Sequence, residues 1–309
     1  MKAKKYYAYF SLLVILAFMA YIIYDSVKPV RETAESPDTK VRNEGYSDQW
    51  FIAREVFIRE GLKAICVSEN GEIFLGGSSF LISFDREMNK NWEIGFPAEV
   101  TALAVYGDSL FAASEETVYV VGKDGKIRGE WGPYDDGSLI TSVTANNRYI
   151  AVADAGNKIV FIIKKDGEVF SMVGHFGEKL HIPSPFFDVA LTDNNLLLMA
   201  NTGYYRIETR SLDGKILSSF GTSGMKPEGF CGCCNPAHFA LIPQGIITSE
   251  KGINRIKILD FAGNFTELVS SVNNFTASVP LDVASTDGKI IYCANPADSK
   301  LYVFNRLIN

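Results

Sequence analysis

The sequence predicts an all-β fold, a six-bladed β-propeller, preceded by an N-terminal transmembrane helix. Short runs of β-branched and aromatic residues alternate with turn dipeptides over most of the chain. The glycines of four such turns, Gly125, Gly167, Gly214 and Gly263, are spaced by 42, 47 and 49 residues. A repeat of this length with four strands in each unit is typical of propeller blades.

The first 24 residues have the pattern of a cytoplasmic tip followed by a membrane signal anchor. Three lysines precede an uncharged apolar run, residues 6–24. A helix of about 20 residues spans the hydrocarbon core, and basic residues before it favour a cytoplasmic N-terminus. A cleaved signal peptide is the alternative, but a cut after Ala20 places bulky Phe18 where a small residue is required. We therefore expect a single membrane span, with the propeller outside the cytoplasm, in the periplasm.

Residues 25–47 are expected to form a flexible tether. They mix charged residues with Pro, Ser and Thr and contain almost no large apolar residues. Such a composition cannot bury enough apolar surface to form a core. The propeller is therefore predicted over residues 48–309.

Each blade is predicted to begin near one residue of its inner strand. These residues are Leu62, Val100, Leu139, Phe187, Ala237 and Leu281. The last unit contains only three strand-like runs, and its missing outer strand is predicted at residues 49–58, "QWFIAREVFI". Pairing both ends of the propeller in one blade closes the ring and removes exposed sheet edges, which favours this arrangement.

Residues 152–177, "VADAGNKIVFIIKKDGEVFSMVGHFG", resemble the NHL repeat. Residues 200–221 repeat the pattern well, later units less well, and the first two blades are degenerate. The resemblance covers about residues 60–305 and implies an NHL-like six-bladed propeller. One repeat position carries a basic residue, which we interpret as a blade-stabilising charge. It is occupied by Lys158, Arg206, Arg255 and Lys300.

The segment "FCGCCNPAHF" places Cys231, Cys233 and Cys234 in the predicted connection between blades 4 and 5. In NHL-like units such connections lead toward the central axis, so His181 and His238 are expected near these thiols. Thiolates and imidazoles bind soft metals and iron–sulfur clusters, although this spacing matches no common zinc or ferredoxin motif. Outside the cytoplasm, a disulfide among the three cysteines is the competing hypothesis.

Other residues near this segment have simpler explanations. Cys66 and Cys293 lie inside strand runs and are expected to be buried as small apolar residues. Glu250 and Lys251, in "TSEKG", could face the site or solvent, and solvent is favoured. The motif "CGCCNP" followed by "TSEKG" is similar to a subset of bacterial, membrane-anchored NHL-like propellers, a resemblance that implies no particular activity.

The net charge and the repeat motif limit the classes of function that the protein can have. The formal net charge is −6, and −9 without Lys2, Lys4 and Lys5, so the chain offers no broad basic surface for nucleic acid. NHL-like propellers serve as protein-binding, RNA-binding, lyase and lactonase scaffolds, so the resemblance does not select among them. The leading prediction is a membrane-anchored binding or assembly module that docks a protein partner on the face that carries residues 230–239, which we call the Cys loop. The alternatives are a redox or metal-binding protein that uses the Cys loop, and a metal-dependent lyase- or hydrolase-like enzyme.

Overall fold

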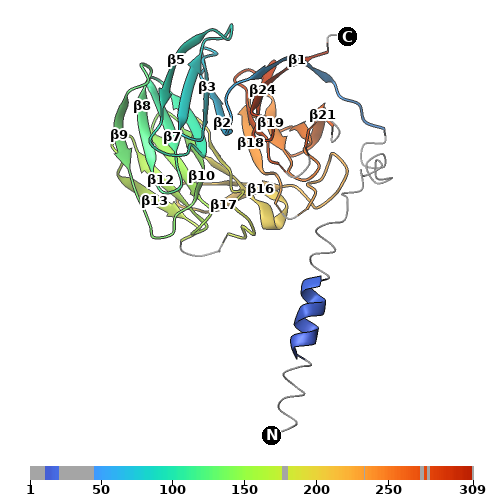
Figure 1. Cartoon of the computed structure of the whole chain (residues 1–309). Coiled ribbons are helices and arrows are strands. Elements are labelled where there is room, and N and C mark those ends of the chain that lie inside the picture. Colours follow the sequence, from blue (N-terminus) through green and yellow to red (C-terminus); the bar gives the residue numbers. More distant parts are fainter. Residues whose placement is uncertain are drawn as a thin grey trace. The chain divides into compact units, whose positions relative to one another are not determined.

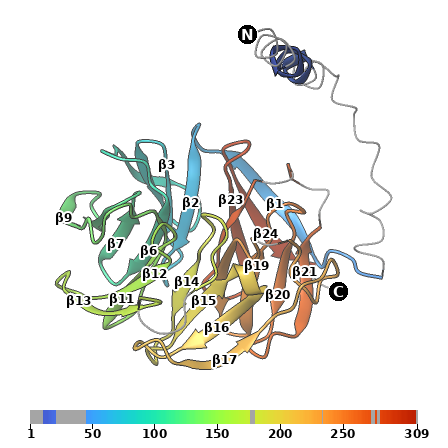
Figure 2. The same ribbon diagram turned by 90° about the horizontal axis from the view of Figure 1, so that it is seen from below.

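The computed structural model describes residues 11–20, 45–175, 180–232, 234–271, 275–276 and 279–307. The chain divides into two units, Met1–Val41 and Arg42–Asn309. In the first unit, residues 11–20 are helical (Figure 1). In the second, the described strands form six four-stranded antiparallel sheets arranged in a ring (Figures 1 and 2). The predicted all-β six-bladed propeller is confirmed.

Five sheets consist of consecutive strands, ordered from the inner to the outer edge. Blade 1 comprises β2 (Leu62–Val67), β3 (Ile73–Gly77), β4 (Phe80–Phe84) and β5 (Lys90–Gly95). Blade 2 comprises β6 (Ala102–Tyr106), β7 (Ser109–Ala113), β8 (Val118–Gly122) and β9 (Ile127–Trp131). Blade 3 comprises β10 (Ile140–Ala145), β11 (Tyr149–Asp154), β12 (Ile159–Lys164) and β13 (Val169–Val173).

The later blades follow the same order. Blade 4 comprises β14 (Val189–Leu191), β15 (Leu197–Asn201), β16 (Arg206–Arg210) and β17 (Ile216–Phe220), with a short 3₁₀ turn, η1 (Thr202–Tyr204), after β15. Blade 5 comprises β18 (His238–Ile242), β19 (Gly245–Ser249), β20 (Ile256–Leu259) and β21 (Phe265–Ser270). Blade 6 comprises β22 (Asp282–Ala284), β23 (Ile290–Asn295), β24 (Lys300–Arg306) and β1 (Trp50–Phe57).

The N-terminal strand of the propeller, β1, is the outer strand of the last blade. It pairs antiparallel with β24, from Trp50 opposite Arg306 to Phe57 opposite Lys300. The Trp50 side chain is buried, and its Nε1 donates a hydrogen bond to Glu267 Oε2 at 2.8 Å. Figure 2 shows the blue β1 beside the red β24, so the sheet is completed from both ends of the propeller.

The hydrophobic core lies between the blades. One cluster of buried apolar residues fills the space between each pair of neighbouring blades, including the pair formed by the first and last. Strands such as β12 read as continuous apolar runs because neighbouring blades cover both of their faces. Outer strands such as β17 are largely exposed, which explains their polar residues.

The four turn glycines join the third and fourth strands of their blades. Gly125, Gly167, Gly214 and Gly263 have φ values of 76°, 92°, 94° and 88°. This left-handed backbone conformation costs little for glycine and is strained for other residues. The spacing of these glycines therefore equals the number of residues from one blade to the next.

Among the described residues, no helix is both long and apolar enough to cross a membrane. The predicted span, residues 6–24, is described only at residues 11–20. Its two ends, and the predicted tether up to residue 44, lie outside the described residues. At the end of the tether, the Tyr46 ring packs edge-on against the Phe265 ring, with 5.4 Å between their centroids.

Candidate functional site

The Cys loop lies on one face of the propeller, which we call the connection face. In antiparallel four-stranded blades, each connection to the next inner strand lies at the same face as the turn between the second and third strands. The connection face therefore carries residues 221–232 and 234–237, with the described part of the Cys loop, and the turn 250–255 of blade 5. The connection between blades 1 and 2, residues 96–101, is much shorter.

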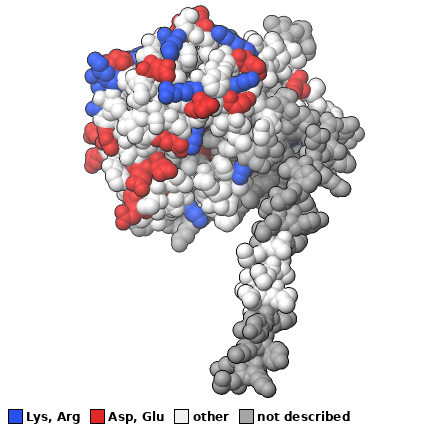
Figure 3. Space-filling model, in the orientation of Figure 1, with Lys and Arg blue, Asp and Glu red and all other residues white. Residues whose placement is uncertain are grey.

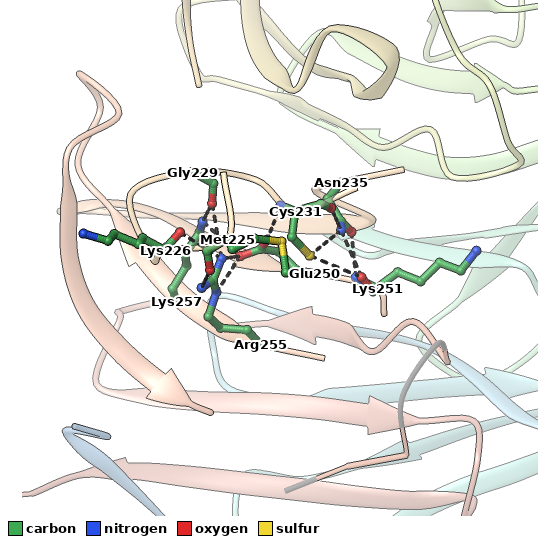
Figure 4. A network of polar contacts seen from close by, with 9 residues as sticks. All are labelled: Met225, Lys226, Gly229, Cys231, Asn235, Glu250, Lys251, Arg255 and Lys257. Carbon is green, nitrogen blue, oxygen red and sulfur yellow. Dashed lines mark hydrogen bonds and ion pairs between the residues drawn. The ribbon is translucent and has the colours of Figure 1, made fainter. Parts of the chain in front are cut away.

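Cys231 is buried at the base of the Cys loop, with 5% of its surface exposed. Its backbone N–H donates a hydrogen bond to Glu250 Oε2 at 2.9 Å, and its Sγ lies 3.8 Å from the carbonyl oxygen of Lys251. Asn235 Nδ2 donates to the Cys231 carbonyl oxygen and lies 3.4 Å from Sγ. Asn235 also exchanges two hydrogen bonds with the Lys251 backbone, at 2.6 and 2.9 Å. These contacts attach the Cys loop to the turn that follows β19 (Figure 4).

A buried ion cluster, Glu250, Arg255 and Lys257, lies beneath the connection. All three side chains are fully buried. Glu250 Oε1 accepts a hydrogen bond from Arg255 Nε at 2.8 Å and lies 2.9 Å from Lys257 Nζ. Arg255 Nη1 donates to the Met225 carbonyl oxygen at 2.9 Å, and Lys257 Nζ donates to that of Gly229. The cluster therefore holds residues 225–229 of the connection against blade 5, as Figure 4 shows.

Arg255 occupies the basic position of the repeat, where a blade-stabilising role is predicted. In blade 4 the equivalent Arg206 donates from Nε to the buried carboxylate of Glu208 at 2.7 Å. In blade 6, Lys300 Nζ lies 3.3 Å from Glu55 of the outer strand. These ion pairs lie within single blades, and the blade-stabilising role of the basic position stays a prediction.

Burial controls the protonation of the Cys231 thiol. Loss of solvation, followed by the nearby Glu250 carboxylate, raises the pKa of Cys231 from 9.0 to about 11. Burial also lowers the pKa of Lys257 to about 8, although Glu250 acts in the opposite direction. At neutral pH Cys231 is therefore a thiol, whereas a metal ligand or nucleophile must be a thiolate.

A second polar group, the axial cluster, consists of Asp188, His238 and Asp282. These residues stand at the starts of the inner strands of blades 4, 5 and 6 and line an axial cavity of about 220 Å³. His238 Nδ1 lies 3.7 Å from Asp188 Oδ2 and 3.9 Å from Asp282 Oδ1. Asp188 accepts the Phe239 N–H at 2.7 Å, and Asp282 accepts the Ile65 N–H at 2.8 Å. Each carboxylate thus connects its own blade to the next one.

The axial cluster has shifted protonation equilibria. Burial lowers the pKa of His238, but the hydrogen bond with Asp188 and the charges of both aspartates outweigh burial and raise it. Burial raises the pKa of Asp282 to about 6, against the opposing effect of His238. Near pH 6 the cluster therefore changes its charge.

The structure separates the predicted metal ligands. His238 belongs to the axial cluster, whereas His181 is exposed, with its ring centroid 5.4 Å from that of Tyr204. Cys233 lies outside the described residues. Among the residues that are described, no three His, Cys, Asp or Glu side chains form a group able to hold a metal ion. A metal or cluster bound by Cys231, Cys233 and Cys234 stays a prediction. Metal analysis and visible absorption of the purified protein would test it.

The buried position of Glu250 differs from the prediction, and the axial aspartates were not predicted. Glu250 is completely buried, so its predicted place in solvent is wrong: Arg255 and Lys257 balance its charge inside the blade. The charged residues within the apolar run "NRIKIL" were the available signal. The axial aspartates also have a signal, because "DVA" occurs at both Asp188 and Asp282.

The remaining cysteines are structural. Cys66 in β2 and Cys293 in β23 are buried, which confirms the prediction. Burial raises the pKa of both thiols well above the ordinary value. Neither is therefore a reactive group of the connection face.

No protein-family model matches the chain, and no curated protein matches it. The fold is similar to a streptogramin B lyase structure, with a TM-score of 0.61 at 14% identity over 84% of this chain and all of that one. Virginiamycin B lyase from Staphylococcus aureus gives 0.59 at 16% identity, again over 84% of this chain and 100% of that one. The WD40 propeller domain of Doa1 gives 0.56 at 13% identity, over 80% of this chain and 79% of that one. Similarities at these identities show the fold alone.

Proposed function

We propose that the chain is a membrane-anchored, extracytoplasmic binding module that docks a protein partner on the connection face near blades 4 and 5. One observation carries this proposal: residues 225–231 of a long connection are fixed from below by the buried ion cluster. Binding residues occur preferentially on loops that a rigid scaffold positions. A connection held in one conformation loses little conformational entropy when a partner binds.

The side chains around the Cys loop suit a protein interface. Met225 and Tyr204 are 41% and 47% exposed, and both residue types are enriched at interfaces. In Figure 4 the Lys226 and Lys251 side chains extend away from the buried cluster in opposite directions. The Lys251 ammonium lies 4.6 Å above the Phe186 ring, which gives it a defined place on the face.

The fold similarities include both protein-binding propellers and enzymes. WD40 propellers, such as the Doa1 domain, commonly act as protein-interaction scaffolds, and lyases share the same architecture. Because one fold supports both classes, the similarity does not favour either, whereas the fixed connection on the connection face supports a binding role. Figure 3 shows acidic and basic side chains interspersed over the displayed surface of the propeller, which suits a partner of mixed charge.

The anchor and the NHL-like repeat are part of the proposal. The uncharged run of residues 6–24 with lysines before it supports a single span with a cytoplasmic N-terminus. The repeat of residues 152–177 supports an NHL-like blade pattern. Together they describe a propeller held close to the outer surface of a membrane by residues 25–47.

Site-specific photo-crosslinking in native membranes tests the docking face. A photoreactive amino acid is placed at Met225 or Tyr204, and at Phe261 as the matched control. Phe261 is 55% exposed but lies in the turn between β20 and β21, on the opposite face. We expect the same protein adduct at Met225 and Tyr204, in several-fold greater yield than at Phe261. Equal yields at the three positions, or an adduct at Phe261 alone, would reject docking on the connection face.

A further inference from the structure

We propose that Cys231 and Cys234 form a thiol–disulfide exchange pair on the connection face, with Glu250 as the proton acceptor of Cys231 and a disulfide-bonded protein as the co-reactant. This activity goes beyond the proposed binding role and does not require it. The two cysteines have the Cys-x-x-Cys spacing of dithiol redox motifs. Between them, Gly232 has a φ of 63°, a left-handed conformation that costs little for glycine.

The two thiols differ in accessibility, as an exchange pair requires. Cys231 is buried, whereas Cys234 is partly exposed. A sulfur atom of another protein therefore reaches Cys234 first, and Cys231 is sheltered from direct attack. This assigns Cys234 as the attacking cysteine and Cys231 as the resolving one.

The buried thiol needs a proton acceptor close by. Only a thiolate attacks a disulfide, and Cys231 is buried, so its proton must leave through a group inside the protein rather than directly to solvent. A carboxylate beside the cysteine provides such a group.

Glu250 has the position and the surroundings of such an acceptor. Its Oε2 accepts a hydrogen bond from the Cys231 N–H at 2.9 Å, which places the carboxylate next to this residue. Arg255 and Lys257 balance the charge of Glu250 inside the blade. Asn235 Nδ2, 3.4 Å from the Cys231 sulfur, can donate to the negative charge that develops there.

The reaction balances without any other oxidant. The Cys234 thiolate, after losing its proton to solvent, attacks the partner disulfide; one partner sulfur leaves as a thiolate and the other remains bonded to Cys234. The Cys231 thiol then passes its proton to Glu250 as its sulfur attacks Cys234, and the second partner thiolate leaves. In the net reaction, the Cys231–Cys234 bond forms and the partner disulfide breaks. Two electrons pass to the partner, whose two thiolates take up the two protons through Glu250 and solvent.

The test uses the full-length, fully reduced protein and glutathione disulfide as the probe. Peptide mapping after rapid acid quenching follows each cysteine with time. In the wild type we expect brief glutathionylation of Cys234, followed by a Cys231–Cys234 disulfide. Cys231→Ser should trap the mixed disulfide on Cys234 in near-stoichiometric yield, and Cys234→Ser should slow the overall reaction at least tenfold. Trapping on Cys233, or a wild-type disulfide between Cys233 and Cys234, would overturn the assignment.

Glu250→Gln tests the proton acceptor while keeping the shape of the side chain. The mixed disulfide should form on Cys234 at the wild-type rate but resolve at least tenfold more slowly. Resolution at the wild-type rate would remove Glu250 from the mechanism. If this variant does not fold, the pH dependence of wild-type resolution decides: an unaided thiol predicts a tenfold rise per pH unit from pH 6 to 9, whereas an internal acceptor predicts a plateau well below pH 9.

Discussion

At the scale of single residues, Glu250 has two roles: it belongs to the buried ion cluster of blade 5 and it contacts Cys231 of the Cys loop. Its carboxylate balances two buried cations and accepts the Cys231 N–H, so it serves the blade and the Cys loop together. A complete buried ion group adds little net stability compared with apolar packing, but removal of one member leaves an uncompensated charge. Lys158, Arg206, Arg255 and Lys300 share one repeat position, which is why the sequence predicted their role. Their acidic partners follow no such repeat and were therefore missed.

We expect Glu250→Ala to lower the free energy of unfolding by about 3–5 kcal/mol, because Arg255 and Lys257 remain buried without their counter-charge. The matched control is Glu55→Ala, which removes the partner of Lys300 from an ion pair with 55% and 33% of the two side chains exposed. It should cost less than about 1 kcal/mol. Denaturant unfolding of both variants measures the difference; equal losses would contradict the assignment of the cluster as a buried support.

The axial cluster predicts a pH dependence of stability. Asp282 has a folded pKa of about 6 against an ordinary value of 3.8, so protonation favours the folded state. The resulting stability is fully present below pH 3.8 and is lost as the pH rises through about 6. His238, whose pKa is also raised, loses its contribution as the pH rises through its folded pKa.

Unfolding free energies of the wild type and Asp282→Asn, measured between pH 4 and 7, test this sign. Asparagine keeps an acceptor for the Ile65 N–H, so the blade contact persists. The wild type should lose stability relative to the variant as the pH rises, because groups that do not interact with Asp282 cancel in the comparison. His238, whose pKa Asp282 raises, acts in the same direction. Parallel curves for the two proteins would show that Asp282 titrates normally.

At the scale of elements, the strands were predictable because local signals define them. Turn glycines with positive φ recur in blades 2 to 5, and each predicted inner-strand start falls within two residues of the observed strand. The axial cluster was not predictable in the same way. Asp188, His238 and Asp282 are far apart in sequence, and only the closed ring brings the starts of β14, β18 and β22 together. A search for the residue at the same position of each inner strand would have found them.

The closing strand makes a prediction at this scale. Deletion of residues 49–58 removes β1, leaves the edge of β24 unpaired and uncovers the apolar cluster that contains Trp50. We expect a lower melting temperature and lower solubility, because an unpaired edge invites association with other chains. Deletion of residues 31–40, which has the same length but lies in the predicted tether, is the control and should change neither property. If the two deletions behave alike, the ring does not depend on β1.

At the scale of the whole molecule, a ring closed from both ends constrains where the propeller can be attached. Since β1 is the outer strand of blade 6, the chain enters the propeller at its rim rather than at its axis. Under the proposed function, the attachment point at the rim and the docking site on the connection face are then separate parts of the propeller.

The proposed anchor is the last prediction. If residues 6–24 span the bilayer uncleaved, N-terminal sequencing of protein extracted from membranes should read from the first residues of the chain, and alkaline carbonate should not release the protein. Replacing Leu12 and Leu16 by arginine should release it, because each arginine near the centre of a span costs about 2.5–3.5 kcal/mol. Glutamine at residues 32 and 35, outside the apolar run, is the control and should leave the protein in the membrane fraction. A mature start near Tyr21 would instead show that the apolar run is a cleaved signal, and residues 25–47 would then be a free N-terminal arm of a released propeller.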